Sequence, residues 1–330
     1  MSVFDEIKQG LYEAIEYEKE GLNAKSLPDR TGGIEMNKRN QNIQVFEESK
    51  QLWETNEKLR ESVVRSFQNQ QFVGAAEGVA SAPPTEGASA KVIVSKKRTL
   101  DAAEPYVRDG KKTCVLNFAS ATNPGGGVVH GSSAQEECLC RCSTLYPCLN
   151  TRDMWSSFYS PHRKAGNPLY NDDCIYTPDV CVFREDTEYP SLLPAEKWWK
   201  VNVITCAAPN LRKVPSNAMN PNAGIKAAQV SDEELEGLLT SRIRRIFTLA
   251  AMEGNEVLIL GVFGCGAFQN PPEVVARVFR KVLGEYRFAF ETVEFAVYCT
   301  PRDMRNYEVF REAMRSEGER TAPVQMPNCI

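Results

Sequence analysis

Three consecutive glycines, Gly125-Gly126-Gly127, stand a short distance before the triplet Gln135-Glu136-Glu137. Because glycine has no Cβ atom, the backbone N–H groups of such a loop can approach a diphosphate or a ribose, and adjacent amides can form an anion-binding nest. Two carboxyl groups then follow within reach of a ligand on that loop. Each motif alone is typical of an ordinary turn or of a helix start. Their order predicts a ligand site.

The position of the glycine loop supports this interpretation. Residues 113–118 form a strand-like run that leads directly into the loop, and α/β proteins bind ligands at the ends of such strands. A second glycine-bearing loop follows another strand-like run at residues 257–263. It consists of Gly264, Cys265, Gly266, Ala267 and Phe268, and it precedes a helix opened by Pro271-Pro272. Helix starts attract phosphate, so the two loops together predict a diphosphate cradle.

At these residues the sequence resembles the microbial-type poly(ADP-ribose) glycohydrolase family. The signature of that family is three glycines, a spacer of about six to eight residues, and Gln-Glu-Glu; here the spacer is residues 128–134. The resemblance extends over roughly residues 90 to 300. Further segments match the family pattern in the family's order, namely residues 117–121, 139–146, 208–210 and 261–272.

The resemblance implies an α/β fold, a macrodomain-like α/β/α sandwich with an N-terminal helical extension. It also implies hydrolysis of the ribose–ribose O-glycosidic bonds of poly(ADP-ribose), with ADP-ribose as product and with neither a cofactor nor a metal. Glu137 would protonate the leaving hydroxyl group and then act as base on the incoming water. Glu136 would orient the terminal ribose, and Gln135 would support the same region.

The resemblance assigns the remaining ligand contacts to the two loops. The second loop would wrap the diphosphate, with Phe268 against the ribose, although core packing is the alternative for this side chain. Ser120 stands where animal-type members carry Asn, and Asn123 lies nearer the glycines, so the ribose contact of that Asn is not assured. The substrate-binding residues predicted from the first loop are Ser120, Asn123, Gly125, Gly126, Gly127, Val128 and Gln135.

Other functions remain open at this point. A macrodomain that binds ADP-ribose without hydrolysing it has no need of the acidic pair, and an enzyme that acts on mono-ADP-ribosylated protein would have a similar site. His130 lies inside the spacer and could act as an acid or base. The cysteines at 138, 140 and 142 could suggest zinc, but their spacing puts Cys140 on a different helix face, and packed core thiols are the alternative.

Composition and charge narrow the class of protein. The chain has 330 residues, 42% of them hydrophobic and 25% charged, which is typical of a globular protein. Its net charge of −4 does not favour direct readout of nucleic acid, so an ADP-ribose polymer would be held by local amides and a few side chains. No apolar stretch approaches a membrane span, no signal peptide is evident, and the eleven cysteines are an odd count. We therefore expect reduced thiols and a cytoplasmic location.

The hydrophobic pattern divides the chain into three parts. Residues 1–73 show helical spacing and form a predicted N-terminal extension, which either packs on the main domain or serves as an interaction platform. Residues 74–90 are small, polar and rich in Pro and Gly, so they predict a linker or loop. Residues 91–330 form the predicted catalytic domain. Its strands are expected at 92–94, 113–118, 201–206, 257–263 and 293–299, with helices after a capping box at Ser231–Glu234 and after Pro271-Pro272.

Overall fold

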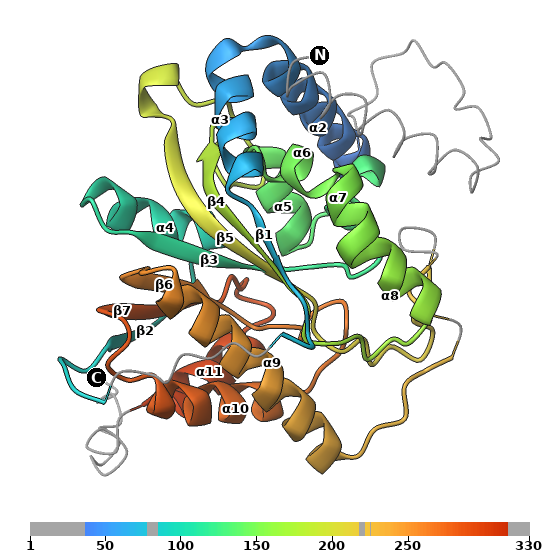
Figure 1. The fold of residues 1–330 in the computed structure, drawn as a ribbon, viewed down its shortest axis with the longest axis vertical. Coiled ribbons are helices and arrows are strands. Elements are labelled where there is room, and N and C mark those ends of the chain that lie inside the picture. Colours follow the sequence, from blue (N-terminus) through green and yellow to red (C-terminus); the bar gives the residue numbers. More distant parts are fainter. Residues whose placement is uncertain (1–36, 78–84, 218–221, 225, 316–330) are drawn as a thin grey trace, which may run out of the picture.

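The computed structural model describes residues 37–77, 85–217, 222–224 and 226–315. Helix formation predicted for residues 1–36 lies outside these ranges. Within them, a seven-stranded sheet runs through the centre of the molecule in the order β1-β4-β5-β3-β6-β7-β2 (Figure 1). The strands are β1 (Gln71–Val73), β2 (Lys91–Ser95), β3 (Thr113–Phe118), β4 (Cys174–Val182), β5 (Trp199–Cys206), β6 (Val257–Leu260) and β7 (Thr292–Ala296).

Helices cover both faces of the sheet. One apolar core joins it to α2 (Lys38–Thr55), α3 (Glu57–Gln68), α4 (Thr99–Arg108), α5 (Gln135–Cys142), α6 (Leu145–Leu149) and α7 (Arg152–Met154). A π-helical turn at Trp155–Tyr159 leads on to α8 (Ser160–Ala165). The second core contains α9 (Asp232–Met252), α10 (Pro272–Glu285) and α11 (Arg305–Ala313), which lie on the opposite side in Figure 1. The predicted α/β sandwich is confirmed.

Strand β3 shows why the sheet is buried on both faces. Successive side chains of a strand point to opposite sides. Val115 accordingly belongs to the core on the α2–α7 side, whereas its neighbours Cys114 and Leu116 belong to the core on the α9–α11 side. A continuous apolar run is therefore required in this strand, in place of an alternating one.

The direction of the strands places both glycine loops at one edge of the sheet. Strands β5, β3, β6, β7 and β2 are parallel; at one side β4 pairs antiparallel with β5, and β1 pairs antiparallel with β4. β3 and β6 are direct neighbours. The loops that follow them thus begin side by side, at the carboxyl ends where open α/β sheets bind their ligands.

Several local predictions are confirmed. Strand β3 has the predicted bounds, and Ser231 and Glu234 form a reciprocal capping box at the start of α9. Helix α10 begins at Pro272 with Pro271 as its N-cap residue. Two predicted strands end three residues early, because the chain turns out of the sheet after Leu260 and Ala296. Strand β4 was not predicted.

The described part of the N-terminal segment packs onto the rest of the fold. Phe46 and Trp53 of α2, and Leu59 and Val63 of α3, are at most 2% exposed and belong to the core on that face. Residues 71–73, which the sequence pattern predicts as helical, form β1 and pair with β4. In the parts of the chain that are described, no helix is both long and apolar enough to cross a bilayer.

Candidate active site

The glycine loop and the acidic pair meet at Gly126. Its φ of 59° lies in the left-handed region, and a Cβ atom there would lie 2.6 Å from Glu137 Oε1 and 3.0 Å from Glu136 Oε2. Both carboxyl groups therefore converge on the α-carbon of this residue, although they are adjacent in sequence. They can do so because they stand in the first turn of α5. A side chain at position 126 would be both strained and in collision with the acids.

Glu137 is held by one oxygen and free at the other. Its Oε1 accepts a hydrogen bond of 2.9 Å from the backbone N–H of Gly127. Its Oε2 is buried and has no hydrogen-bond partner among the described residues. The residue is 7% exposed, and burial raises the pKa of its carboxyl group. An unpartnered buried carboxyl oxygen with a raised pKa is typical of a group that transfers a proton.

Glu136 is held by both oxygens. Oε2 accepts from the N–H of Ser120 at 2.7 Å, and Oε1 accepts from Asn117 Nδ2 at 3.3 Å. Glu136 is 3% exposed; burial, followed by repulsion from Glu137, raises its pKa well above the ordinary value. The two carboxyl groups are thus rigidly placed and cannot both ionise readily.

Gln135 anchors the start of α5 to β3. Its Oε1 accepts from the N–H of Phe118 at 2.9 Å, while Nε2 donates to the carbonyl of Leu116 at 2.8 Å and to Thr99 Oγ1 at 3.1 Å. The side chain continues the hydrogen bonding of the strand edge. It also lines the adjoining pocket, so the predicted substrate-binding residue has a structural task as well.

Ser120 and Asn123 shape the first loop. Ser120 Oγ accepts from the N–H groups of Thr122 at 3.3 Å and Asn123 at 3.1 Å, which closes a tight turn before the glycines. The side-chain oxygen of Asn123 accepts from Arg163. Val128 is fully buried in the core. Its N–H donates to the carbonyl of Gly125 at 3.1 Å, so this amide is hydrogen-bonded within the loop.

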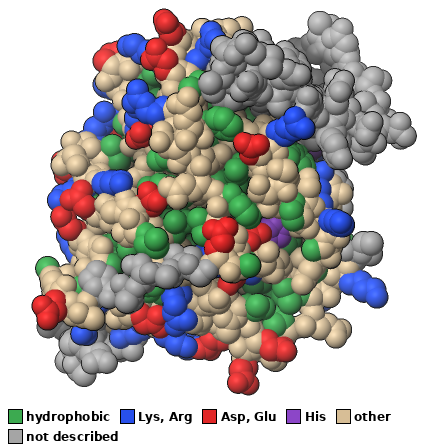
Figure 2. Space-filling view, in the orientation of Figure 1, with side chains coloured by type: hydrophobic (Ala, Val, Ile, Leu, Met, Phe, Trp, Pro, Cys, Tyr) green, Lys and Arg blue, Asp and Glu red, His purple; other side chains and the backbone are tan. Residues whose placement is uncertain are grey.

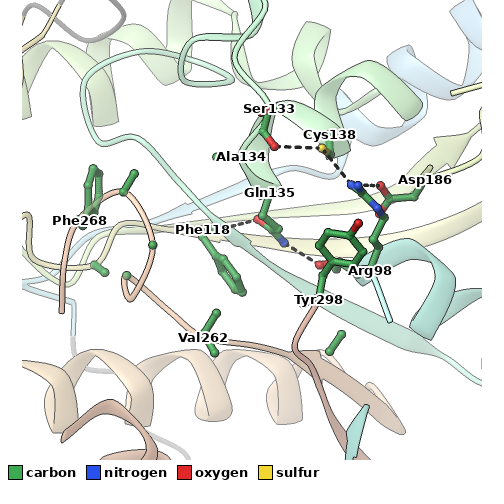
Figure 3. A pocket seen from close by; sticks show the side chains of 16 residues that line it. Arg98, Phe118, Ser133, Ala134, Gln135, Cys138, Asp186, Val262, Phe268 and Tyr298 are labelled. Carbon is green, nitrogen blue, oxygen red and sulfur yellow. Dashed lines mark hydrogen bonds and ion pairs between the residues drawn. The ribbon is translucent and has the colours of Figure 1, made fainter. Parts of the chain in front are cut away.

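A pocket of about 310 Å³ opens between the second loop and the start of α5 (Figure 3). Phe268 lies on one side of it and Gln135 on the other. Four of the five predicted residues of the second loop line it, namely Gly264, Gly266, Ala267 and Phe268. The fifth, Cys265, is not among the lining residues, and burial raises the pKa of its thiol to about 12. The ring of Phe268 also packs on Tyr170, with centroids 6.0 Å apart.

The three glycines of the first loop and the two glutamates do not line this pocket, whereas Ala134 and Gln135, which directly precede the glutamates, do. The opposite end of the pocket is formed by residues that sequence reasoning missed. Arg98 Nη1 lies 3.7 Å from Asp186 Oδ1 and 3.7 Å from Cys138 Sγ. Its guanidinium carbon lies 4.2 Å from the ring centroid of Tyr298. These side chains come from separate segments with no shared motif, so only the fold brings them together.

The alternatives involving metal and histidine gain no support from the geometry. Within the described ranges, no group of three His, Cys, Asp or Glu side chains is placed to hold a metal ion. Cys140 and Cys142 are fully buried, and burial raises the pKa of both thiols well above the ordinary value. His130 is partly buried, which lowers its pKa. Its backbone carbonyl accepts a hydrogen bond of 2.8 Å from Arg39.

Fold and site together define a three-layer α/β protein with two glycine loops at one sheet edge and a buried acid pair beside them. Comparison with protein families finds the microbial-type PARG catalytic domain over residues 39–185. A search of curated proteins finds no match.

Solved structures extend the match over most of the chain. Poly(ADP-ribose) glycohydrolase from Thermomonospora curvata is 30% identical with a TM-score of 0.72, and the match covers 83% of this chain and 100% of that one. The same enzyme bound to the inhibitor ADP-HPD matches with a TM-score of 0.70 at 30% identity, over 83% and 99% of the two chains. The enzyme from Deinococcus radiodurans in complex with ADP-ribose is 34% identical with a TM-score of 0.64, over 76% and 96%. The chain belongs to the microbial-type poly(ADP-ribose) glycohydrolase family.

Proposed function

We propose that this protein hydrolyses the ribose–ribose O-glycosidic bonds of poly(ADP-ribose) and releases ADP-ribose. Two kinds of support meet here. The family membership supplies the reaction class, and the related structures contain ADP-ribose or the inhibitor ADP-HPD. The observation that carries the proposal is the convergence of two buried carboxyl groups on Gly126, beside a pocket of about 310 Å³. A protein that only binds ADP-ribose has no need to bury this pair.

Glu137 is the proposed general acid and base. Since burial raises its pKa, Glu137 keeps its proton to a higher pH than an exposed glutamate does, and this proton is available to the oxygen of the leaving ribose. Transfer of that proton accompanies cleavage of the bond between the anomeric carbon and this oxygen, and an oxocarbenium-like centre develops. Water then attacks the anomeric carbon and gives its proton to the Glu137 carboxylate, which restores the acid. The balance is one water consumed for each ADP-ribose released.

Glu136 and the loops position the substrate in this proposal. Glu136 accepts a hydroxyl hydrogen bond from the terminal ribose, while Asn117 and the Ser120 N–H keep its carboxyl group in place. The second loop lines the pocket and would hold the diphosphate, with Phe268 against the adjoining ribose. The N–H groups of Gly126, Gly127 and Val128 donate within the protein, so the first loop contributes through its shape and its contact with the acids. Ser120, Asn123 and Gln135 contribute mainly by fixing the loop and the helix start. No metal or cofactor takes part.

We further infer that the segment from Gly125 to Glu137 is the family signature and that the sandwich is a macrodomain-like one. The division into a helical extension at 1–73, a linker at 74–90 and a catalytic domain at 91–330 also stays a prediction, as does the cytoplasmic location. Fractionation of cells that produce the protein would check the location.

The direct test is release of ADP-ribose from purified polymer, followed by chromatography. We expect activity from the unaltered protein and little from mono-ADP-ribosylated protein. Glu137→Gln keeps the shape of the side chain but cannot donate and accept the proton, so release falls by about 100-fold to 10,000-fold, while ADP-ribose still binds in calorimetry. Glu233→Gln, an exposed glutamate on α9, serves as the matched control and leaves activity unchanged. Full activity of Glu137→Gln would overturn the catalytic assignment.

A further inference from the structure

Four side chains outside the acidic pair connect two points of the first glycine loop. They are Tyr146, Asn150, Trp155 and Arg163, and we name them the loop brace. Tyr146 comes from α6 and Arg163 from α8, while Asn150 and Trp155 lie between. None of them lines the pocket. Each of them contacts the next, from Arg163 to Tyr146.

Arg163 holds the first point. Its Nε donates to the backbone carbonyl of Thr122 at 2.6 Å, and its Nη2 donates to the side-chain oxygen of Asn123. Both acceptors lie in the turn between β3 and the glycines. A planar guanidinium that makes two bonds fixes orientation as well as position, which a lysine cannot do.

Trp155 and Asn150 carry the contact onward. The guanidinium carbon of Arg163 lies 4.4 Å from the Trp155 ring centroid. Trp155 Nε1 donates to Asn150 Oδ1 at 2.7 Å, and Asn150 Nδ2 donates to the hydroxyl oxygen of Tyr146 at 3.2 Å. Trp155, Asn150 and Tyr146 are buried, so these bonds are protected from water.

Tyr146 contacts the loop at the second point, Gly125. A Cβ atom on Gly125 would lie only 2.8 Å from Tyr146 Cδ2, so the ring packs directly against the bare α-carbon. The ring is itself held by Phe46 and Trp53 of α2, at centroid distances of 4.9 and 6.2 Å. The loop is therefore gripped at Thr122–Asn123 and at Gly125.

The braced turn leads to the acidic pair. Ser120 Oγ accepts from the N–H groups of Thr122 and Asn123, and the Ser120 N–H in turn donates to Glu136 Oε2. We propose that Arg163 is a positioning residue for the hydrolysis: it keeps the glycine loop in the ligand-ready conformation and, through Ser120, keeps Glu136 in place. This inference rests on the proposed function.

The test combines Arg163→Ala and Arg163→Lys with ADP-ribose binding and polymer hydrolysis. A small displacement of the loop lowers the rate of the chemical step more than it weakens binding. We therefore expect kcat/KM to fall by about 100-fold in Arg163→Ala. The Kd for ADP-ribose rises on the order of tenfold, because the loop has to be ordered on binding. Arg163→Lys recovers little of either, since it keeps the charge but not the two bonds. Arg277→Ala, an exposed arginine on α10, is the matched control.

Chemical rescue separates positioning from general destabilisation. Guanidinium at about 20 mM, far below the molar range that unfolds proteins, should restore part of the kcat/KM of Arg163→Ala, whereas urea and ammonium should not. Tyr146→Phe keeps the ring against Gly125 but removes the hydroxyl group that accepts from Asn150, and we expect its effect on kcat/KM to be less than additive with that of Arg163→Ala.

The outcomes are distinct. Loss of activity with rescue by guanidinium, or a non-additive double variant, supports the brace. Unchanged kcat/KM in both Arg163 variants overturns it and leaves the proposed function intact. A fall in kcat/KM without rescue and with strict additivity also overturns it, because the loss is then one of stability. If the unaltered protein neither binds ADP-ribose nor hydrolyses polymer, the function and the brace both fail.

Discussion

The carboxyl group of Glu136 is buried beside that of Glu137, so its ionisation lowers the stability of the folded state. Asn117 and the Ser120 N–H stabilise its charged form, but burial and the neighbouring Glu137 oppose ionisation more strongly, so its pKa lies well above the ordinary 4.5. Carboxyl groups with strongly raised pKa values cluster at functional sites. The pair should therefore be visible in the stability of the protein, independently of any assay of activity.

The free energy of unfolding should depend on pH through Glu136. A group whose pKa is raised on folding contributes stability that is present below about pH 4.5 and is lost as pH rises through the folded-state pKa. Glu136→Gln has no such proton. We expect the melting temperature of Glu136→Gln, relative to that of the unaltered protein, to increase from about pH 5 to about pH 8.

The decisive quantity is the slope of the difference in melting temperature against pH. Glutamine also loses one hydrogen-bond acceptor, but this shifts the melting temperature by a constant amount. Thermal unfolding followed by circular dichroism at several pH values measures the slope. The exposed control Glu233→Gln should show a flat difference. A flat difference for Glu136→Gln as well would mean that the carboxyl group ionises as easily in the fold as outside it.

At the scale of elements, the sequence pattern predicted what is locally encoded. Strand β3, the capping box of α9 and the proline start of α10 each depend on residues that are neighbours in the chain. Strand β4 escaped prediction because Pro178 and Asp179 interrupt it: Asp179 has φ of 56°, and the register with β5 shifts between Thr177 and Val180. A bulge of this kind hides a strand from pattern reasoning.

The site divides in the same way. Gly126 and Glu137 could be paired from the sequence because a short spacer separates them. Arg98, Asp186 and Tyr298 could not, since they meet only after β2 and β7 have paired and the segment after β4 has folded over α4. Arg163 was missed for the same reason: its partners Thr122 and Asn123 lie about forty residues earlier.

Helix α2 holds the spacer between the glycines and the acids. Asn42 Nδ2 donates to the carbonyl of Gly131 at 3.0 Å, and Gly131 has φ of 76°. A Cβ atom there would lie 2.3 Å from the backbone oxygen of Arg39, which cannot move without shifting the helix. We expect Gly131→Ala to destabilise the protein by at least about 1–2 kcal/mol and to lower activity, because the left-handed conformation is strained for alanine and α2 is displaced.

Gly237→Ala is the matched control for this prediction. Gly237 lies inside α9 with nothing near its would-be Cβ, so alanine should instead stabilise the protein by about 0.5–1 kcal/mol. Denaturant unfolding of the two variants measures both changes. A neutral or stabilising effect of Gly131→Ala would show that α2 does not approach the spacer this closely.

At the scale of the molecule, the arrangement of parallel strands does most to create the site. β3 and β6 are neighbours, so loops that are more than a hundred residues apart in sequence begin at one edge of the sheet. The helices above and below then fix them, with α2, α6 and α8 on the first loop and the segment at 208–211 on the second, where the Leu211 N–H donates to the carbonyl of Phe268 at 2.9 Å. Ligand binding thus depends on local geometry more than on overall charge.

Binding of ADP-ribose should therefore depend only weakly on salt concentration. The net charge is −4, and Figure 2 shows acidic and basic side chains intermixed over the face in view. Arg98 is the only lysine or arginine among the described residues that line the pocket. A diphosphate held by backbone amides and at most one cation releases few counterions.

Calorimetry over about 0.05 to 0.3 M salt measures this dependence. We expect the logarithm of ADP-ribose affinity, plotted against the logarithm of salt concentration, to have a slope no steeper than about −1. Arg98→Gln should flatten it further, whereas the Arg277→Ala control should not. A slope of about −3 would require several cations at the diphosphate, and the amide-based site would then be wrong.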